Sequence, residues 1–158
     1  MRRVLPLSAL LLALAFSPAP VYGPKPDDLE TMQGEWQLHE WLENGRRATA
    51  ADVRKEGVDA AIKVAEDQWT QSIWLPTAEG SLEERVTLTV RKIDRSKSPK
   101  QIVLGCDYGD VVCIYRLDRD MLTVRVGAVG VAPANFTNSM TKPGTEASEI
   151  MVFKRKKP

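Results

Sequence analysis

The sequence has little of what metal centres and catalytic sites usually need. Its 158 residues include one histidine and two cysteines, which are too few soft ligands for a typical transition-metal site. It contains no nucleophile elbow, zinc-protease, phosphate-loop or calcium-loop motif. His39 would point away from Trp36 and Leu38 on an alternating strand, and therefore toward solvent. We expect no enzymatic activity, no metal and no cofactor.

The chain also lacks an excess of either charge and, after its first residues, lacks long apolar runs. There are 22 basic and 21 acidic residues, which give a formal net charge of +1. Such a chain has no long-range field with which to collect nucleic acid. The one dense charge cluster, at 154–157, is typical of a solvated strand end. No later segment has the roughly 18 apolar residues of a membrane span, so we expect none in the mature protein.

The first 23 residues have the layout of a secretory signal peptide. Two arginines precede an apolar stretch at 4–16, and small residues and prolines follow it. Cleavage is expected between Ala15 and Gly23, and residues 24–158 are expected to form a single domain. An uncleaved membrane anchor is the alternative, although the apolar stretch is short for one. We expect the mature protein to be exported to the periplasm, the cell envelope or the medium.

Most of the remaining sequence alternates apolar and polar residues, which is the period of half-buried β-strands. The clearest case is Val86, Leu88 and Val90, which alternate with arginines and threonines and which we expect to face the core. Eight short strands are predicted, at 35–39, 60–64, 69–75, 85–91, 102–106, 111–117, 122–126 and 150–153.

Connections of hairpin length join these predicted strands, and no strand–helix–strand spacing or internal repeat is visible. Helical pattern occurs only at 27–34, where Asp27 can cap the helix and Gly34 can end it, and just after Thr49. Residues 127–148 are expected to form a long loop. An up-and-down barrel would bury one face of each strand and leave no open edge. We therefore predict a mainly β fold, an eight-stranded antiparallel barrel with a short N-terminal helix, and a small sandwich is the alternative.

Two cysteines in an exported chain suggest a disulfide. A two-residue turn centred on Gly109 and Asp110 would place Cys106 directly opposite Cys113, with the geometry that a disulfide needs. A turn centred on Tyr108 and Gly109 would leave the two thiols diagonal. We favour the disulfide, with two buried free thiols as the alternative.

Two features at the ends of the predicted barrel resemble the lipocalins. Gly34-Glu35-Trp36 on the first strand has the Gly-x-Trp pattern, and the last strand carries Lys154 and Arg155. In lipocalins and their relatives, such a tryptophan packs under a basic side chain from the last strand. The resemblance thus implies that Trp36, in its motif with Gly34, closes the barrel together with Lys154 or Arg155, whose cation would stack on the indole.

A longer series of segments is similar to a family of small secreted lipocalin-like domains that is common in planctomycete bacteria. The matching segments are LETMQGEW at 29–36, ENGRRA at 43–48, YRLD at 115–118 followed by Leu122, and 136–155 around Pro143-Gly144. This resemblance implies an eight-stranded barrel and export, and it implies no established reaction. Trp41, Trp69 and Trp74 are not part of the pattern.

Two function hypotheses follow, because a barrel of this size either holds one small ligand or fills with its own side chains. In the first, the protein binds a small hydrophobic or amphipathic molecule, with Trp69, Trp74 and Tyr115 near the lumen or its mouth. An inward Tyr115 needs a hydrogen-bond partner, which a ligand or a backbone group would supply. In the second, a filled barrel is a structural or protein-interaction module that acts through its surface and the 127–148 loop.

Overall fold

The protein is mainly β in the part described by a computed structural model, residues 27–43, 46–127, 129–136 and 149–157. The helices of this part are α1 (Asp28–Met32) and α2 (Ala50–Lys55). The strands are β1 (Gly34–Glu43), β2 (Arg46–Thr49), β3 (Asp59–Ala65), β4 (Gln68–Thr77), β5 (Gly80–Asp94), β6 (Lys100–Cys106), β7 (Gly109–Asp118), β8 (Met121–Arg125) and β9 (Ile150–Arg155). The predicted signal peptide at 1–23 lies outside the described residues, as does most of the 127–148 loop.

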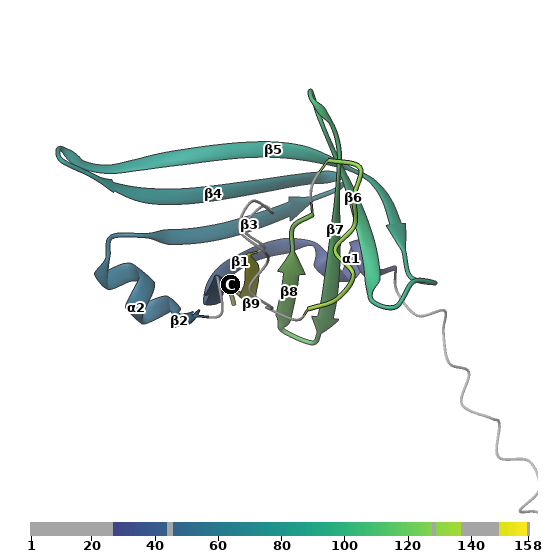
Figure 1. The fold of residues 1–158 in the computed structure, drawn as a ribbon, viewed down its shortest axis with the longest axis horizontal. Coiled ribbons are helices and arrows are strands. Elements are labelled where there is room, and N and C mark those ends of the chain that lie inside the picture. Colours follow the sequence, from purple (N-terminus) through teal and green to yellow (C-terminus); the bar gives the residue numbers. More distant parts are fainter. Residues whose placement is uncertain (1–26, 44–45, 128, 137–148, 158) are drawn as a thin grey trace, which may run out of the picture.

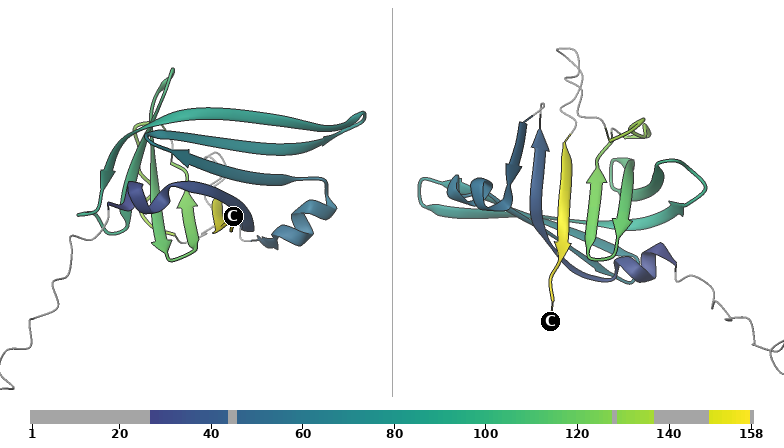
Figure 2. Two further views of the ribbon diagram at one scale, coloured as in Figure 1. Left: turned by 180° about the vertical axis from the view of Figure 1, so that it is seen from behind. Right: turned by 90° about the horizontal axis from the view of Figure 1, so that it is seen from below.

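Eight of these strands close into an antiparallel barrel (Figure 1). β1 pairs with β3, each strand from β3 to β9 pairs with the next one, and β9 pairs back with β1. The view from below shows the closure, with yellow β9 lying between β1 and β8 (Figure 2). The predicted eight-stranded, up-and-down barrel with a short N-terminal helix is confirmed.

The barrel interior is filled with side chains. The inward-facing residues of the strands form one continuous apolar cluster. Its largest members, Trp36, Trp69, Tyr115 and Phe153, are each at most 1% exposed. An eight-stranded barrel is just wide enough for side chains to fill it, so these rings occupy much of the enclosed space.

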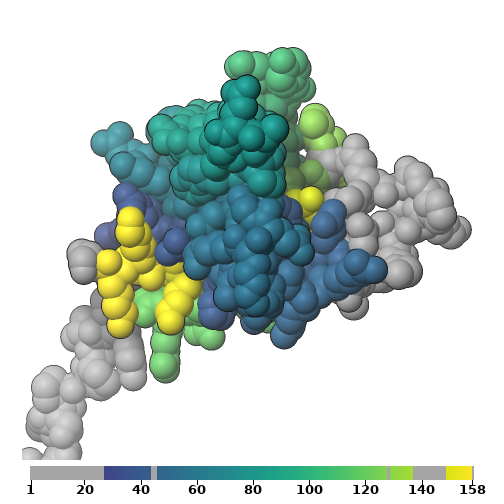
Figure 3. All heavy atoms as spheres, turned by 90° about the vertical axis from the view of Figure 1, so that its left-hand side faces the viewer, coloured from purple at the N-terminus to yellow at the C-terminus, as the bar shows by residue number. Residues whose placement is uncertain are grey.

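The hairpin of β4 and β5 extends past the rest of the barrel (Figure 1), and its teal tip points toward the viewer in Figure 3. β6 pairs with β5 only from Thr89 to Asp94, so the first half of β5 has a strand neighbour on one side only. Val86 is therefore 54% exposed, whereas Val90 is 9% exposed. The prediction that Val86, Leu88 and Val90 all belong to the core is wrong for Val86. The part of β5 that carries Val86 extends beyond the segment that pairs with β6.

On the edge that does not pair with β9, β1 changes its partner strand halfway along its length. Its first residues pair with β3, whereas residues 40–43 pair with β2, a ninth strand that no pattern in the sequence predicted. α2 follows β2 directly. Its N-cap is Thr49, whose hydroxyl accepts a hydrogen bond from the backbone N–H of Asp52, so the predicted helical start after Thr49 is confirmed.

α1 lies where the first helix was predicted, but its ends differ from the prediction. It ends at Met32, and Asp27 precedes it without a capping hydrogen bond from its side chain. Gly34 opens β1 instead of ending the helix, and its φ of +113° is one that residues with a side chain rarely adopt. No helix in the described ranges is long and apolar enough to cross a membrane.

Cys106 and Cys113 are free thiols, so the predicted disulfide is wrong. The hairpin between β6 and β7 turns at residues 107–108, and Cys106 pairs with Gly109. Cys113 instead lies opposite Ile102 in the buried core. The turn falls two residues earlier than the turn that would bring the thiols together.

Candidate functional site

The closed base of the barrel is built around Trp36. Its indole N–H donates a hydrogen bond of 2.8 Å to the carbonyl oxygen of Met32, which ties α1 to β1. The guanidinium of Arg155 lies 4.1 Å from the centre of the indole ring and donates to two carbonyl oxygens at the end of α1. Lys154 is exposed. Of the two basic partners that the resemblance implied, the one that stacks on Trp36 is Arg155.

A polar cluster at the same base holds the hydroxyl group of Tyr115. This hydroxyl donates to the carboxylate of Asp28 at 2.5 Å, and the Lys100 ammonium lies 2.8 Å from the same oxygen. Burial opposes ionisation of Asp28, but the hydrogen bonds from Lys100 and Tyr115 outweigh it and lower the pKa of Asp28. Burial and the Asp28 carboxylate raise the pKa of Tyr115. The partner that Tyr115 needs is therefore a side chain of the protein.

The three residues predicted to line a ligand site do not come together. Trp69 and Trp74 both belong to β4, but they are five positions apart and lie on opposite faces of the strand. Trp69 is 1% exposed inside the barrel, and Trp74 is half-buried on the outside. Tyr115 is inside, at the base. Their role as ligand contacts stays a prediction, and Trp74 alone among them faces outward.

The mouth of the barrel, between β1, β2 and α2, has a hollow of about 540 Å³ lined by Trp41 and Val53, among others. Trp41 packs against the edge of the core, and its buried indole nitrogen has no hydrogen-bond partner within the described residues. Burial and the nearby Glu43 carboxylate raise the pKa of Glu149 in this region. The mouth is thus a small hollow with one unused donor.

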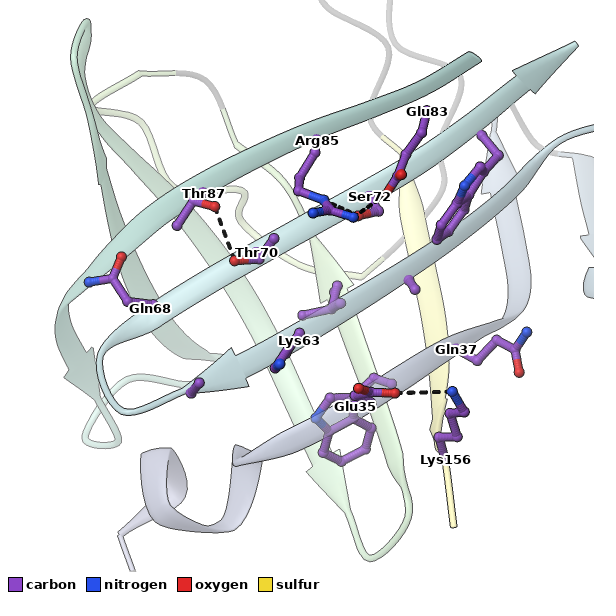
Figure 4. A pocket seen from close by; sticks show the side chains of 15 residues that line it. Glu35, Gln37, Lys63, Gln68, Thr70, Ser72, Glu83, Arg85, Thr87 and Lys156 are labelled. Carbon is purple, nitrogen blue, oxygen red and sulfur yellow. Dashed lines mark hydrogen bonds and ion pairs between the residues drawn. The ribbon is translucent and has the colours of Figure 1, made fainter. Parts of the chain in front are cut away.

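A larger groove, of about 710 Å³, runs along the outer face of β3, β4 and β5 (Figure 4). Its floor consists of small side chains. Ala61 of β3 is the cross-strand neighbour of Ser72 on β4, and Ala65 lies on the same outer face of β3. These short side chains leave room above the sheet, and the volume is in the range of small-molecule sites.

Charged side chains form the two walls of this groove (Figure 4). On one wall, the Arg85 guanidinium donates to the Glu83 carboxylate at 2.7 Å and to the Ser72 hydroxyl at 3.4 Å. Hydrogen bonds from Arg85 and Ser72 lower the pKa of Glu83, which keeps its carboxylate ionised. On the opposite wall, Lys156 and Glu35 form an ion pair at 3.1 Å. The groove therefore offers fixed donors and acceptors on both sides.

Trp74 lies on the same face, with Asp59 and Glu83 as its cross-strand neighbours. The other three tryptophans belong to the core or pack against it, and Trp74 does neither. Trp74 thus presents an aromatic ring that the fold does not use, next to small and polar side chains. Large aromatic rings with polar neighbours are typical of binding sites.

The sequence singled out Trp74 but placed it near the lumen or its mouth, and it gave no signal for Ser72, Glu83 and Arg85 as site residues. The alternation of β4 already separates Trp74 from Trp69, so counting along the strand would have placed Trp74 outside. The grouping of Ser72 with Arg85 depends on cross-strand register, which the sequence does not reveal. In the described ranges, no three His, Cys, Asp or Glu side chains could together hold a metal ion.

Comparisons with known proteins give a structural similarity at low sequence identity. No protein-family model matches the chain, and no curated protein sequence matches it. Among solved structures, the chain is similar to the siderocalin Ex-FABP, which is described as functioning through dual ligand specificities. The two share 11% identity with a TM-score of 0.42, over 80% of this chain and 74% of that one. The fold assignment rests on the strand order and closure of this chain's own barrel.

Proposed function

We propose that this lipocalin-like barrel binds a small amphipathic molecule in the outer groove beside Trp74. The observation that carries the proposal is the position of Trp74, half-buried on the outer face of a groove of about 710 Å³. Its indole offers a flat apolar surface, and Ser72, Glu83 and Arg85 offer hydrogen bonds beside it. This combination suits a ligand with one apolar face and polar edges.

The barrel interior leaves less room for a ligand. The rings of Trp69 and Phe153, together with Trp36 at the closed base, take up much of this space, and each is at most 1% exposed. A ligand there would have to displace packed side chains, and overfilling a packed core typically costs about 1–3 kcal/mol. The outer groove is already open, so a ligand there displaces only water.

Thermal unfolding of the intact protein with an amphipathic panel tests this proposal. The panel pairs alkyl glycosides with alkyl zwitterions of equal chain length, all below the concentrations at which they form micelles. A ligand at a hundredfold its Kd adds about 2.7 kcal/mol, which raises the melting temperature by several degrees. We expect such a shift for at least one compound, lost in Trp74→Ala and kept in Trp41→Ala at the barrel mouth. The reverse pattern would contradict the proposal.

Exposed apolar residues near the β6–β7 turn favour a second candidate function, protein interaction. Tyr108, Val129 and Val131 are 92%, 57% and 62% exposed, and Val129 bridges to Val111 of β7. Exposed apolar residues that lie together often mark interaction surfaces. Sedimentation at increasing concentration tests a contact between copies of this chain. An increase in mass that Tyr108→Ser reverses would favour this function, and a constant monomer mass would argue against such a contact.

We also propose that the chain is exported and belongs to the family of small secreted domains that its motifs resemble. The support is the sequence pattern: the layout of residues 1–23 and the ordered segments from 29–36 to 136–155. Mass spectrometry of the protein produced in a bacterium with its own leader tests export. We expect a mature chain that begins between residues 16 and 24, and an intact N-terminus would contradict export.

A further inference from the structure

We infer that the ligand of the outer groove is a neutral oligosaccharide. This inference rests on the proposed function and names the chemical class that the groove takes. A sugar ring has a face of C–H bonds and a rim of hydroxyl groups. The C–H face carries slight positive charge, so it packs well on the negative face of an indole. Of the four tryptophans, Trp74 alone stands outside the core and its packed neighbours, where a sugar ring could reach it.

The polar side chains beside Trp74 can bind adjacent hydroxyl groups. Arg85 has five N–H donors, and its bonds to Glu83 and Ser72 occupy two of its nitrogens. Its side chain is 62% exposed, so donors remain available to a ligand. The 2.7 Å contact holds the Arg85 donors next to the Glu83 carboxylate acceptor. A hydroxyl group needs both a donor and an acceptor, and this pair presents them already ordered.

The groove continues along β4 beyond Trp74. The side chains of Ser72, Thr70 and Gln68 follow one another along this strand (Figure 4). The hydroxyls of Thr70 and Thr87 lie 3.1 Å apart across β4 and β5. Gln68 lies farther along, six residues from Trp74, which is about 20 Å at a strand rise of about 3.3 Å per residue. Because this length exceeds that of a single sugar ring, the groove fits a short chain of rings.

The charges of the groove largely cancel, which favours a neutral sugar over an acidic one. Glu83 pairs with Arg85, and Glu35 pairs with Lys156. Lys63 is the remaining lining charge, and it has no ion-pair partner within the described part of the chain. Clustered charge of one sign is what selects charged ligands, and this surface lacks it.

Isothermal titration calorimetry of the intact protein with short neutral oligosaccharides tests the inference. The panel contains oligomers of glucose, N-acetylglucosamine, xylose and mannose. An oligogalacturonate is the acidic comparison, and an alkyl zwitterion is the amphipathic one without a sugar. We expect at least one neutral oligosaccharide to bind, and Trp74→Ala to raise its Kd at least about tenfold, as for a typical aromatic anchor. Trp74→Phe should raise Kd less, since a smaller ring keeps part of the stacking.

The matched control for Trp74→Ala is Trp41→Ala, which removes an indole at the mouth and should leave Kd unchanged. Arg85→Met should raise Kd by about tenfold, the effect of losing a hydrogen bond from a charged donor. Circular dichroism and melting temperature check that each variant is folded.

The outcomes separate the inference from the proposed function. Oligosaccharide binding that Trp74→Ala leaves unchanged overturns both. Binding of the alkyl zwitterion that depends on Trp74, without binding of any neutral oligosaccharide, overturns the inference and leaves the proposed function in place. Tighter binding of the oligogalacturonate than of every neutral sugar also overturns the inference. Failure of every compound to bind overturns both.

Discussion

The base of the barrel and the outer groove use tryptophan in opposite ways. At the base, Trp36 is 1% exposed, its indole N–H is bonded to Met32, and Arg155 covers its ring. In the groove, Trp74 is half-buried, packs on no part of the core, and forms no hydrogen bond within the described residues. Both the N–H group and the ring face of Trp36 thus contact other parts of the fold, whereas the ring of Trp74 remains available to another molecule.

The polar side chains of the two regions differ in the same way. At the base, Tyr115 and Lys100 both bond one oxygen of Asp28, whose side chain is 13% exposed. In the groove, Arg85 is 62% exposed and keeps donors facing solvent. The side chains at the base therefore contribute to stability, whereas those of the groove can change with a smaller loss of stability.

The largest expected effect is that of Trp36→Ala at the base. Removing a fully buried tryptophan typically costs about 3–5 kcal/mol, because the cavity it leaves closes only in part. Trp74→Ala, the matched change in the groove, should cost clearly less, because a half-buried ring outside the core loses less apolar contact and leaves no enclosed cavity. Urea unfolding of both variants measures the difference. Equal losses would mean that Trp74 is part of the fold.

Arg155→Met should have the next largest effect. It removes two hydrogen bonds to carbonyl oxygens at the end of α1 and the contact with the ring of Trp36. We expect a loss of about 2–3 kcal/mol in the free energy of unfolding. Lys154→Met is the control on the neighbouring, exposed residue and should change it by about 0.5 kcal/mol or less. A larger loss in Lys154→Met would show that the wrong cation has been assigned.

Asp28 makes the contribution of the barrel base to the free energy of unfolding depend on pH. Its pKa in the folded protein is below its ordinary value of 3.8, so its carboxylate stabilises the fold above that pH. This contribution is lost as the pH falls through the lowered pKa. Asp28→Asn should therefore cost about 1–2 kcal/mol at pH 7, and the difference from the wild type should shrink below about pH 4. Urea unfolding at a series of pH values measures this, and a difference that stays constant would contradict the ion-pair account.

The cysteines should show the smallest effect on stability. Because both are free thiols, a reducing agent should leave the melting temperature unchanged. Burial raises the pKa of Cys113 to about 11, so this thiol should resist a thiol reagent at pH 8 in the folded protein. Cys106, which is half-buried, should react first. Two thiols should titrate after unfolding, and finding none would show that the disulfide forms.

Much of the fold could be predicted because each strand carries its own period. The alternation around Leu88 indicated a strand, and Gly34 and Trp36 indicated the closed base. β2 could not be predicted from its own residues. It forms because β1 continues beyond the residues that pair with β3 and leaves an edge with which β2 can pair. The exposure of Val86 was missed for a similar reason, because it depends on where β6 stops pairing with β5.

The candidate site was harder to predict than the fold. Ser72, Arg85 and Ala61 belong to three strands, and only the register of those strands places them in one row. A shift of one residue in either pairing would turn the side chain of the shifted strand to the inner face and break the row. Likewise, a shift of two residues in the β6–β7 turn separates Cys113 from Cys106. Local sequence patterns predict single strands and helices. A site whose residues come from several strands can be predicted only when the register between those strands is known.

The most direct test of where the ligand binds uses the four indole N–H signals in a ¹H–¹⁵N spectrum. Single Trp→Phe variants assign each signal, and the intact protein is titrated with the oligosaccharide that binds best. The Trp74 signal should move in proportion to saturation, while those of Trp36, Trp41 and Trp69 should stay in place. Movement of the Trp41 or Trp69 signal with Trp74 unchanged would place the ligand in the barrel and contradict an outer binding site.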